Sequence, residues 1–184
     1  HLESELPTQV KFLSHLIHLG LKNIFVTGTC FEYGLKENEI RADSELFPIN
    51  AYGKAKVQLN MELCKLQEEK KFNLIWARLF YLYGKGQSKK TLLGQLEDAI
   101  KKNKKIFNMS NGDQLRDYFE VNELVKKIIN LSMRQKNLGS INLCSGNPIK
   151  VKNLVKKVCR ENNWKISLNL GYYEISNNEP KNFW

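Results

Sequence analysis

Residues 22 to 34 read KNIFVTGTCFEYG, and this stretch decides the fold. The apolar run at its start is typical of a buried β-strand, and the Thr-Gly-Thr sequence that follows is typical of the end of a strand and the beginning of a loop. A hydroxyl group at the end of such a strand can donate a hydrogen bond to a substrate oxygen. Thr29 is the residue best placed to do so.

Helices and strands alternate around this stretch. A helical pattern of apolar residues ends at Gly20, and residues 52 to about 70 form the next predicted helix. Residues 73–79 form a second continuous apolar run, typical of a strand buried on both faces of a parallel sheet. The order of strand, helix and strand predicts an α/β fold with a right-handed crossover.

The predicted helix after residue 50 begins with Tyr52 and Lys56, four residues apart. Side chains at this spacing share one face of a helix, so the Lys56 ammonium can lie near the Tyr52 phenol. A nearby cation favours the ionised phenol, and we therefore expect Lys56 to lower the pKa of Tyr52. Such a tyrosine could exchange a proton with a substrate hydroxyl. The alternative is a Tyr half in the core beside a solvated Lys.

Four motifs over nearly the whole chain resemble those of the extended short-chain dehydrogenase/reductases, the NAD(P)-dependent sugar-nucleotide epimerases and dehydratases. In chain order they are Thr29-x-x-x-Tyr33-Gly34, Pro48-x-x-x-Tyr52-Gly53-x-x-Lys56, Arg78-x-x-x-x-Tyr83-Gly84-x-Gly86-Gln87 and Gly112-x-x-x-Arg116-Asp117-Tyr118-Phe119-x-Val121. Their order and spacing are far more specific than any one of them.

The resemblance implies the later part of a Rossmann-type parallel sheet with an interleaved small α/β substrate domain. Residues 1–86 are expected to be the C-terminal part of the dinucleotide-binding domain, and residues 87–184 mostly the substrate-binding domain. Residues 140–146 are expected to return to the Rossmann sheet. The family's N-terminal glycine-rich turn, which holds the cofactor pyrophosphate, is missing from this sequence.

The resemblance also assigns site residues. Tyr52 matches the catalytic acid/base, Lys56 the cation that lowers its pKa and grips the nicotinamide ribose, and Thr29 the residue that positions the sugar hydroxyl. Thr27 matches a position that lines the cofactor site, and the expected cofactor is NAD or NADP. Arg116 matches the arginine that contacts the substrate pyrophosphate, and its alternative is pairing with Asp113 or Asp117 in a surface loop.

Two positions depart from the family pattern. The related 4,6-dehydratases carry an Asp-Glu pair directly after the catalytic hydroxyl, whereas this chain has Cys30 and Phe31, so we disfavour that chemistry. Glu32 follows one residue later, but successive side chains at a strand end point in different directions. We therefore expect Glu32 to point away from the position of the dehydratase acid. Many members have Asn where this chain has Tyr81, which puts the usual nucleotide-binding mode in doubt.

Composition excludes several other classes of protein. No apolar stretch is long enough to span a membrane and no signal peptide opens the chain, so we expect a cytoplasmic protein. The four cysteines lack C-x-x-C spacing and no metal site is predicted. The net charge of +10 would suit nucleic acid, but the lysines fall on predicted helices or at their ends, where solvated faces are commoner.

We therefore expect the full-length protein to be an NAD(P)-dependent sugar-nucleotide epimerase or reductase that works by hydride transfer on a nucleotide-activated sugar. A homodimer through the Tyr52 helix and a neighbouring helix is implied by the resemblance. The first alternative is a catalytically inactive fragment that keeps only substrate-domain or oligomer contacts, because the glycine-rich loop is the main anchor of the cofactor. The second alternative, a basic nucleic-acid-binding module, is disfavoured because the aromatic residues fall mostly in apolar strands.

Overall fold

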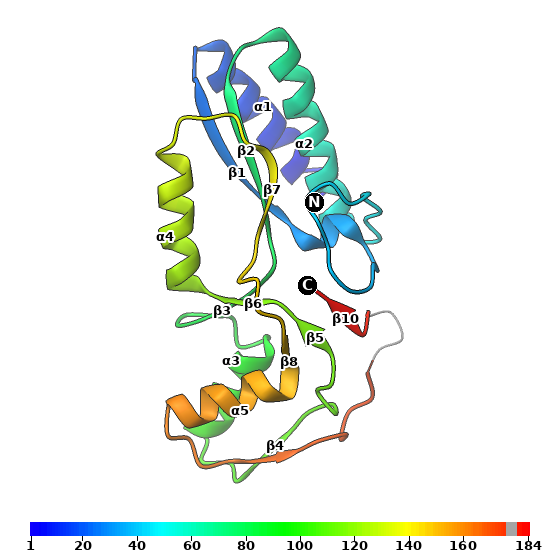
Figure 1. Cartoon of the computed structure of the whole chain (residues 1–184), viewed down its shortest axis with the longest axis vertical. Helices are drawn as coiled ribbons and strands as arrows, with labels where there is room; N and C mark the ends of the chain where they lie inside the picture. Colours follow the sequence, from blue (N-terminus) through cyan, green and yellow to red (C-terminus); the bar gives the residue numbers. More distant parts are fainter. Residues whose placement is uncertain (176–179) are drawn as a thin grey trace. The chain divides into compact units, whose positions relative to one another are not determined.

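The computed structural model describes residues 1–175 and 180–184, which form two compact units (Figure 1). Unit 1 contains residues 1–36, 40–80 and 122–144. Unit 2 contains residues 37–39, 81–121 and 145–184. The chain therefore passes from one unit to the other more than once.

Unit 1 is built on a parallel three-stranded sheet in the order β1-β2-β7. Its strands are β1 (Asn23–Thr29), β2 (Asn73–Leu79) and β7 (Gly139–Leu143). The register pairs Thr29 with Leu79 and Leu79 with Leu143, so the carboxyl ends of all three strands are level. The two predicted strands are present, and of the segment expected to return to this sheet residues 140–143 lie in its third strand. In open α/β sheets this carboxyl edge is where ligands bind.

Helices α1 (Glu5–His18) and α2 (Ala51–Glu69) pack against each other and against the sheet. Their shared core is apolar and includes Ile17, Leu59, Leu63, Leu74 and Trp76. Asn50 caps α2, because its side-chain oxygen accepts a hydrogen bond from the Gly53 amide at 2.7 Å. This cap fixes where the helix begins, directly before Tyr52.

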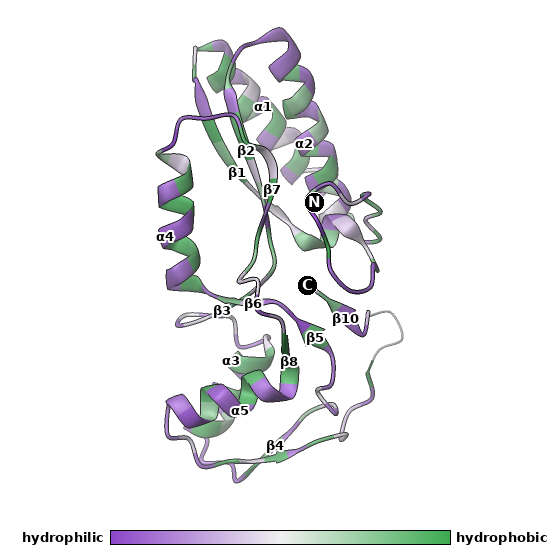
Figure 2. Ribbon diagram, viewed as in Figure 1, coloured by the Kyte–Doolittle hydropathy of each residue, from purple (hydrophilic) through white to green (hydrophobic). Residues whose placement is uncertain are grey.

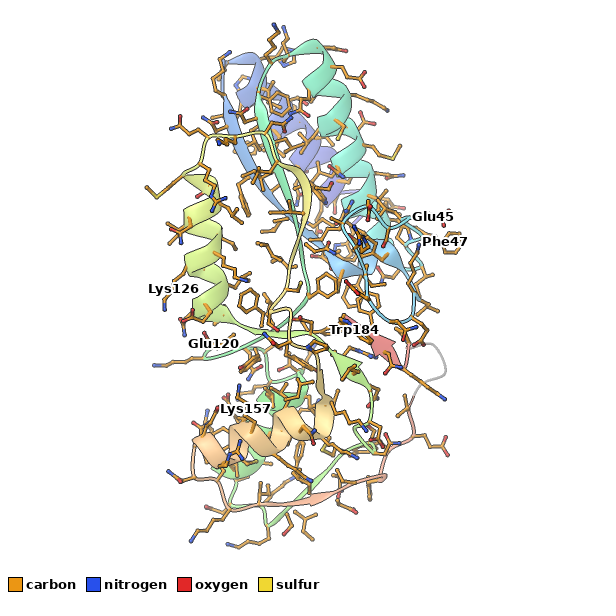
Figure 3. The ribbon with its side chains drawn as sticks, viewed as in Figure 1. Glu45, Phe47, Glu120, Lys126, Lys157 and Trp184 are labelled. Carbon is orange, nitrogen blue, oxygen red and sulfur yellow. The ribbon has the colours of Figure 1, made fainter. Side chains whose placement is uncertain are left out.

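A short 3₁₀ helix, η1 (Cys30–Tyr33), follows β1 where the sequence predicts a loop. Thr29 is its N-cap, and Thr29 with Glu32 forms a capping box. The loop after η1 folds back, since the Phe47 amide donates to the Glu32 carbonyl at 3.1 Å. The Phe47 side chain itself points outward (Figure 3).

Unit 2 packs α3 (Leu92–Lys101) against α5 (Val151–Glu161) around a second apolar core. In Figure 2 α5 carries both hydrophilic and hydrophobic patches, as expected for a helix with one buried side. The unit's short strands are β3 (Tyr81–Tyr83), β4 (Ile106–Asn108), β5 (Leu115–Arg116), β6 (Tyr118–Glu120), β8 (Ile149–Lys150), β9 (Ser167–Asn169) and β10 (Asn182–Phe183). β3 pairs with β6, β4 with β9, and β5 lies between β10 and β8.

The division of the chain differs from the expected boundary at residue 86 in more than one place: residues 37–39 and 81–86 belong to unit 2, and residues 122–139 belong to unit 1. Helix α4 (Val121–Ser132) lies, apart from its first residue, in unit 1. The reason is its connection: α4 leads directly into β7, which pairs with β2. Among the described residues, no helix has the length and apolar character needed to cross a membrane.

Candidate active site

Thr29 is the last residue of β1 and is buried. Its hydroxyl oxygen accepts a hydrogen bond from the Phe31 amide at 3.3 Å. A hydroxyl can accept and donate at once, so the hydroxyl proton of Thr29 stays available for a ligand oxygen. On the other side, the Thr29 amide donates to the Glu32 carboxylate at 2.8 Å. Hydrogen bonds thereby hold both the backbone amide and the hydroxyl oxygen of Thr29.

The first turn of α2 lies directly against η1. A Cβ atom added at Gly53 would stand 2.6 Å from the Phe31 carbonyl oxygen, closer than real side chains approach. Glycine at this position is therefore a condition for the close packing of helix and turn. The neighbouring residue, Tyr52, is brought next to the strand end in this way.

Lys56 joins α2 to β1. Its ammonium donates to the main-chain carbonyl of Thr27 at 2.9 Å and lies 5.9 Å from the centre of the Tyr52 ring. Tyr52 and Lys56 are both partly buried. The structure thus gathers Thr27, Thr29, Tyr52 and Lys56 at the carboxyl end of β1.

The expectation that Lys56 lowers the pKa of Tyr52 is wrong for this structure. Burial raises the pKa of the Tyr52 phenol, and the negative charge of Glu32 raises it further. Burial also lowers the pKa of Lys56. The physical reason is that both groups are partly desolvated and that the negative charge of Glu32 disfavours the ionised phenol.

Glu32 lies at the centre of a buried polar network that the sequence did not reveal. Its carboxylate binds Arg78 at 2.6 Å and the Trp76 indole N–H at 3.1 Å, and the side chains of Glu32 and Arg78 are 0% and 3% exposed. The sequence did contain a signal for the pair of Glu32 and Arg78. Arg78 is a charged residue within an apolar run that is predicted to be buried on both faces. A buried charge needs a partner, and Glu32 is the acidic residue at the end of the adjacent strand.

Arg78 extends this network across the sheet. Its guanidinium donates to the Tyr33 hydroxyl at 3.2 Å and to the Ala42 carbonyl at 3.1 Å. The Tyr33 hydroxyl donates in turn to the Asn142 side chain at 2.6 Å. Glu32 itself therefore points into the protein, in agreement with the expectation that it does not replace the dehydratase acid.

In unit 2 Arg116 is also buried, at 3% exposed. Its guanidinium donates to the carbonyls of Leu115, Lys181 and Pro180 at 2.9, 3.1 and 2.6 Å. It also lies over the Tyr81 ring, 5.6 Å from the ring centre, so these two predicted substrate residues contact each other.

The two acidic residues considered as partners of Arg116 have other roles. Asp113 pairs with Lys150 and Lys152 at 3.1 and 2.8 Å. Asp117 accepts hydrogen bonds from the amides of Ser145 and Gly146, each at 2.7 Å, and so holds the turn after β7. Within residues 1–175 and 180–184, no group of three or more His, Cys, Asp or Glu residues is placed to hold a metal ion.

Comparisons with known proteins agree with this architecture. The chain is 29% identical over 157 residues to dTDP-6-deoxy-L-talose 4-dehydrogenase (NAD(+)) of Aggregatibacter actinomycetemcomitans, covering 85% of this chain and 58% of that protein. Among solved structures, UDP-N-acetylglucosamine 4-epimerase of Methanobrevibacter ruminantium, in complex with UDP-N-acetylmuramic acid, matches with a TM-score of 0.85 and 18% identity, over 96% of this chain and 57% of that one.

UDP-glucuronic acid 4-epimerase of Bacillus cereus, in complex with UDP-glucuronic acid and NAD, matches with a TM-score of 0.82 and 18% identity, over 97% of this chain and 57% of that one. The chain thus spans a little under 60% of the length of these relatives. The model of the NAD dependent epimerase/dehydratase family matches residues 2–144. This match covers most of the chain, and the chain belongs to the NAD dependent epimerase/dehydratase family.

Proposed function

We propose that the protein is an NAD(P)-dependent nucleotide-sugar epimerase or reductase in which Tyr52, Lys56 and Thr29 are the catalytic residues. The observation that carries the proposal is the hydrogen bond of 2.9 Å between the Lys56 ammonium and the Thr27 carbonyl. It brings the Tyr52 helix to the end of the strand that carries Thr29. Three side chains suited to alcohol chemistry thereby share one site.

Each residue has a distinct task in this chemistry. Oxidation of a sugar carbinol requires that the hydroxyl proton be removed as the carbon loses hydride, and the reverse reaction returns that proton. Tyr52 takes and returns the proton. Thr29 donates a hydrogen bond from its hydroxyl to the same oxygen. Lys56 holds α2 against β1 through the Thr27 carbonyl, and its remaining ammonium donors face the ribose of the cofactor in this proposal.

The residues present fit the ribose and nicotinamide end of a dinucleotide. The Lys56 ammonium has three donors, and within the described part of the chain only the Thr27 carbonyl accepts from it. Its remaining donors suit ribose hydroxyls, and the exposed side chain of Thr27 lies at the same strand end. When bound, NAD or NADP supplies the acceptor or donor of hydride.

Substrate recognition is proposed to involve Arg116 and Tyr81 of unit 2. A planar, permanently charged guanidinium suits a pyrophosphate, and the Tyr81 ring beneath it limits how the guanidinium can turn. Arg116 now donates to main-chain carbonyls, so we expect it to exchange some of these for phosphate oxygens when substrate binds. The dTDP- and UDP-sugars named with the similar proteins suggest a nucleoside-diphosphate sugar as substrate.

We also propose a homodimer through α1 and α2. These helices pack together and expose the large apolar side chains of Phe12 and Met61, which are 61% and 54% exposed. Exposed apolar side chains mark an interface when they form one continuous patch, which is what this proposal requires of Phe12 and Met61. Replacing both by Glu is expected to convert a dimer to a monomer in light-scattering measurements, and an unchanged mass would reject this surface.

The first test is calorimetric binding of NAD, NADH, NADP and NADPH, followed by turnover with dTDP-6-deoxy-L-talose, UDP-glucose and UDP-glucuronic acid. We expect micromolar binding of one dinucleotide pair and weaker binding by Lys56→Ala. Lys54→Ala is the matched control, because Lys54 is exposed on the same helix. A folded protein that binds no dinucleotide would reject the proposal and favour an inactive fragment.

A further inference from the structure

Glu32 is a charged residue at a place where charge is costly. It lies directly behind the strand end that carries Thr29, and its side chain is fully buried. Ionised side chains are seldom fully buried unless they are paired and hydrogen-bonded. A buried carboxylate next to a catalytic residue therefore needs an explanation beyond packing.

Both oxygens of this carboxylate accept hydrogen bonds from neighbouring residues. One oxygen accepts from the Thr29 amide at 2.8 Å and from the Trp76 indole at 3.1 Å. The other accepts from Arg78 at 2.6 Å and from the same indole at 3.1 Å. With both oxygens occupied, Glu32 cannot itself bind substrate, and any contribution to the reaction must act through another residue.

The residue through which it acts is Thr29. The Glu32 carboxylate accepts a hydrogen bond from the Thr29 amide, and the Thr29 hydroxyl accepts one from the Phe31 amide. This capping box sets the orientation of the Thr29 hydroxyl. Gly28 makes room for this arrangement. A Cβ atom at Gly28 would overlap the Glu32 carboxylate and the Trp76 indole, so the strand can carry only glycine beneath the carboxylate.

The carboxylate is anchored to the whole sheet. In the register of the strands, Gly28 on β1 pairs with Arg78 on β2, and Arg78 pairs with Asn142 on β7. Arg78 holds Glu32, and Tyr33 links Arg78 to Asn142. The position of the Thr29 amide is thus tied to all three strands at their carboxyl ends.

We propose that Glu32 is a positioning residue, which fixes the backbone and the hydroxyl of Thr29 for proton transfer at Tyr52. This inference rests on the proposed function, because it assigns Thr29 to the binding of the reacting sugar hydroxyl. The same carboxylate also adds to the raised pKa of Tyr52, as expected for a charge close to both residues.

The test compares two double variants that carry no unpaired buried charge. Glu32→Gln with Arg78→Met keeps an oxygen that can accept from the Thr29 amide, whereas Glu32→Ala with Arg78→Met removes it. Glu62→Ala is the surface control, since Glu62 pairs with exposed Lys65 on α2. Hydrogen exchange at the Thr29 amide, kcat and KM are measured for each, with the dinucleotide and nucleotide sugar that the unaltered protein turns over.

We expect exchange at Thr29 to be about tenfold faster in the Ala variant than in the Gln variant, with similar exchange elsewhere in β1 and β2. We expect kcat per folded molecule to be about tenfold lower as well, with KM within about twofold, because misplacement of a reacting group affects the transition state. Equal exchange at Thr29 in the two variants, or equal kcat with unequal exchange, would overturn the proposal.

The exchange measurement does not depend on activity. If the unaltered protein turned over no nucleotide sugar, the proposed function would fail. A difference in exchange at Thr29 would then still show that Glu32 fixes this residue, while rejecting its role in catalysis.

Discussion

The Lys56 ammonium on α2 donates a hydrogen bond of 2.9 Å to the Thr27 carbonyl, 29 residues earlier on β1. This contact links the helix that carries Tyr52 to the strand that ends at Thr29. Together with the close packing of Gly53 on Phe31, it defines the site without any residue from unit 2. The residues proposed for proton transfer therefore all belong to unit 1.

Tyr52→Phe is expected to reduce kcat by about 10²- to 10⁴-fold, because it removes the proton donor and acceptor while keeping the ring. Steady-state kinetics with the dinucleotide and sugar that bind would measure this. Tyr172→Phe, at an exposed tyrosine of unit 2, is the control and should leave kcat unchanged. A Tyr52→Phe variant with normal kcat would assign the proton to another residue.

The raised pKa of Tyr52 predicts how stability depends on pH. The folded protein keeps the phenol proton at pH values where the unfolded chain has begun to lose it, near pH 10. The stabilising contribution is fully present below that pH and is lost as the pH rises through the folded value. Urea unfolding between pH 8 and about 11 should show a steeper loss for the unaltered protein than for Tyr52→Phe. Parallel curves would contradict the direction of the shift.

Arg78→Met alone is expected to lower the free energy of unfolding by about 3–5 kcal/mol, because it leaves the Glu32 carboxylate buried and unpaired. Glu32→Leu combined with Arg78→Met should cost less than Arg78→Met alone, since no buried charge remains. Urea denaturation of Arg78→Met, Glu32→Leu and the double variant gives the coupling free energy between the two side chains. Additive losses would mean that the two side chains do not depend on each other.

Gly53→Ala is expected to destabilise the protein by about 1–3 kcal/mol, although alanine is ordinarily favoured over glycine within a helix by about 1 kcal/mol. The reason is the Phe31 carbonyl, which lies where the new Cβ would be. Gln58→Ala, at an exposed position of α2, should be neutral or slightly stabilising. A stabilising effect of Gly53→Ala would show that η1 and α2 are not packed closely.

Arg116→Lys is expected to weaken binding of a nucleoside-diphosphate sugar about tenfold, because Lys cannot form the paired, planar contacts of a guanidinium. Calorimetry with UDP-glucose, or with another nucleotide sugar that the unaltered protein binds, would measure the change. Binding of the dinucleotide should be unaffected. Equal weakening of both ligands would instead indicate a loss of structure around β5 and β10.

Much of the fold followed from local patterns. The apolar runs at residues 24–26 and 73–79 predicted β1 and β2, because strands buried on both faces leave continuous apolar sequence. Helix α2 and the return of β7 to the sheet also agree with the sequence. Strands β3, β5, β6 and β10 of unit 2 did not follow, because such two- and three-residue strands depend on partners distant in the chain.

The sequence by itself determined the family pattern and the four residues that meet at the end of β1, because motif spacing is written along the chain. Only the tertiary structure decided what surrounds them. It turned Glu32 inward onto Arg78 and Trp76, and it raised rather than lowered the pKa of Tyr52. The burial of Tyr52 and the inward orientation of the Glu32 carboxylate depend on atoms from separate strands and helices. The spacing of residues along the chain does not encode these contacts.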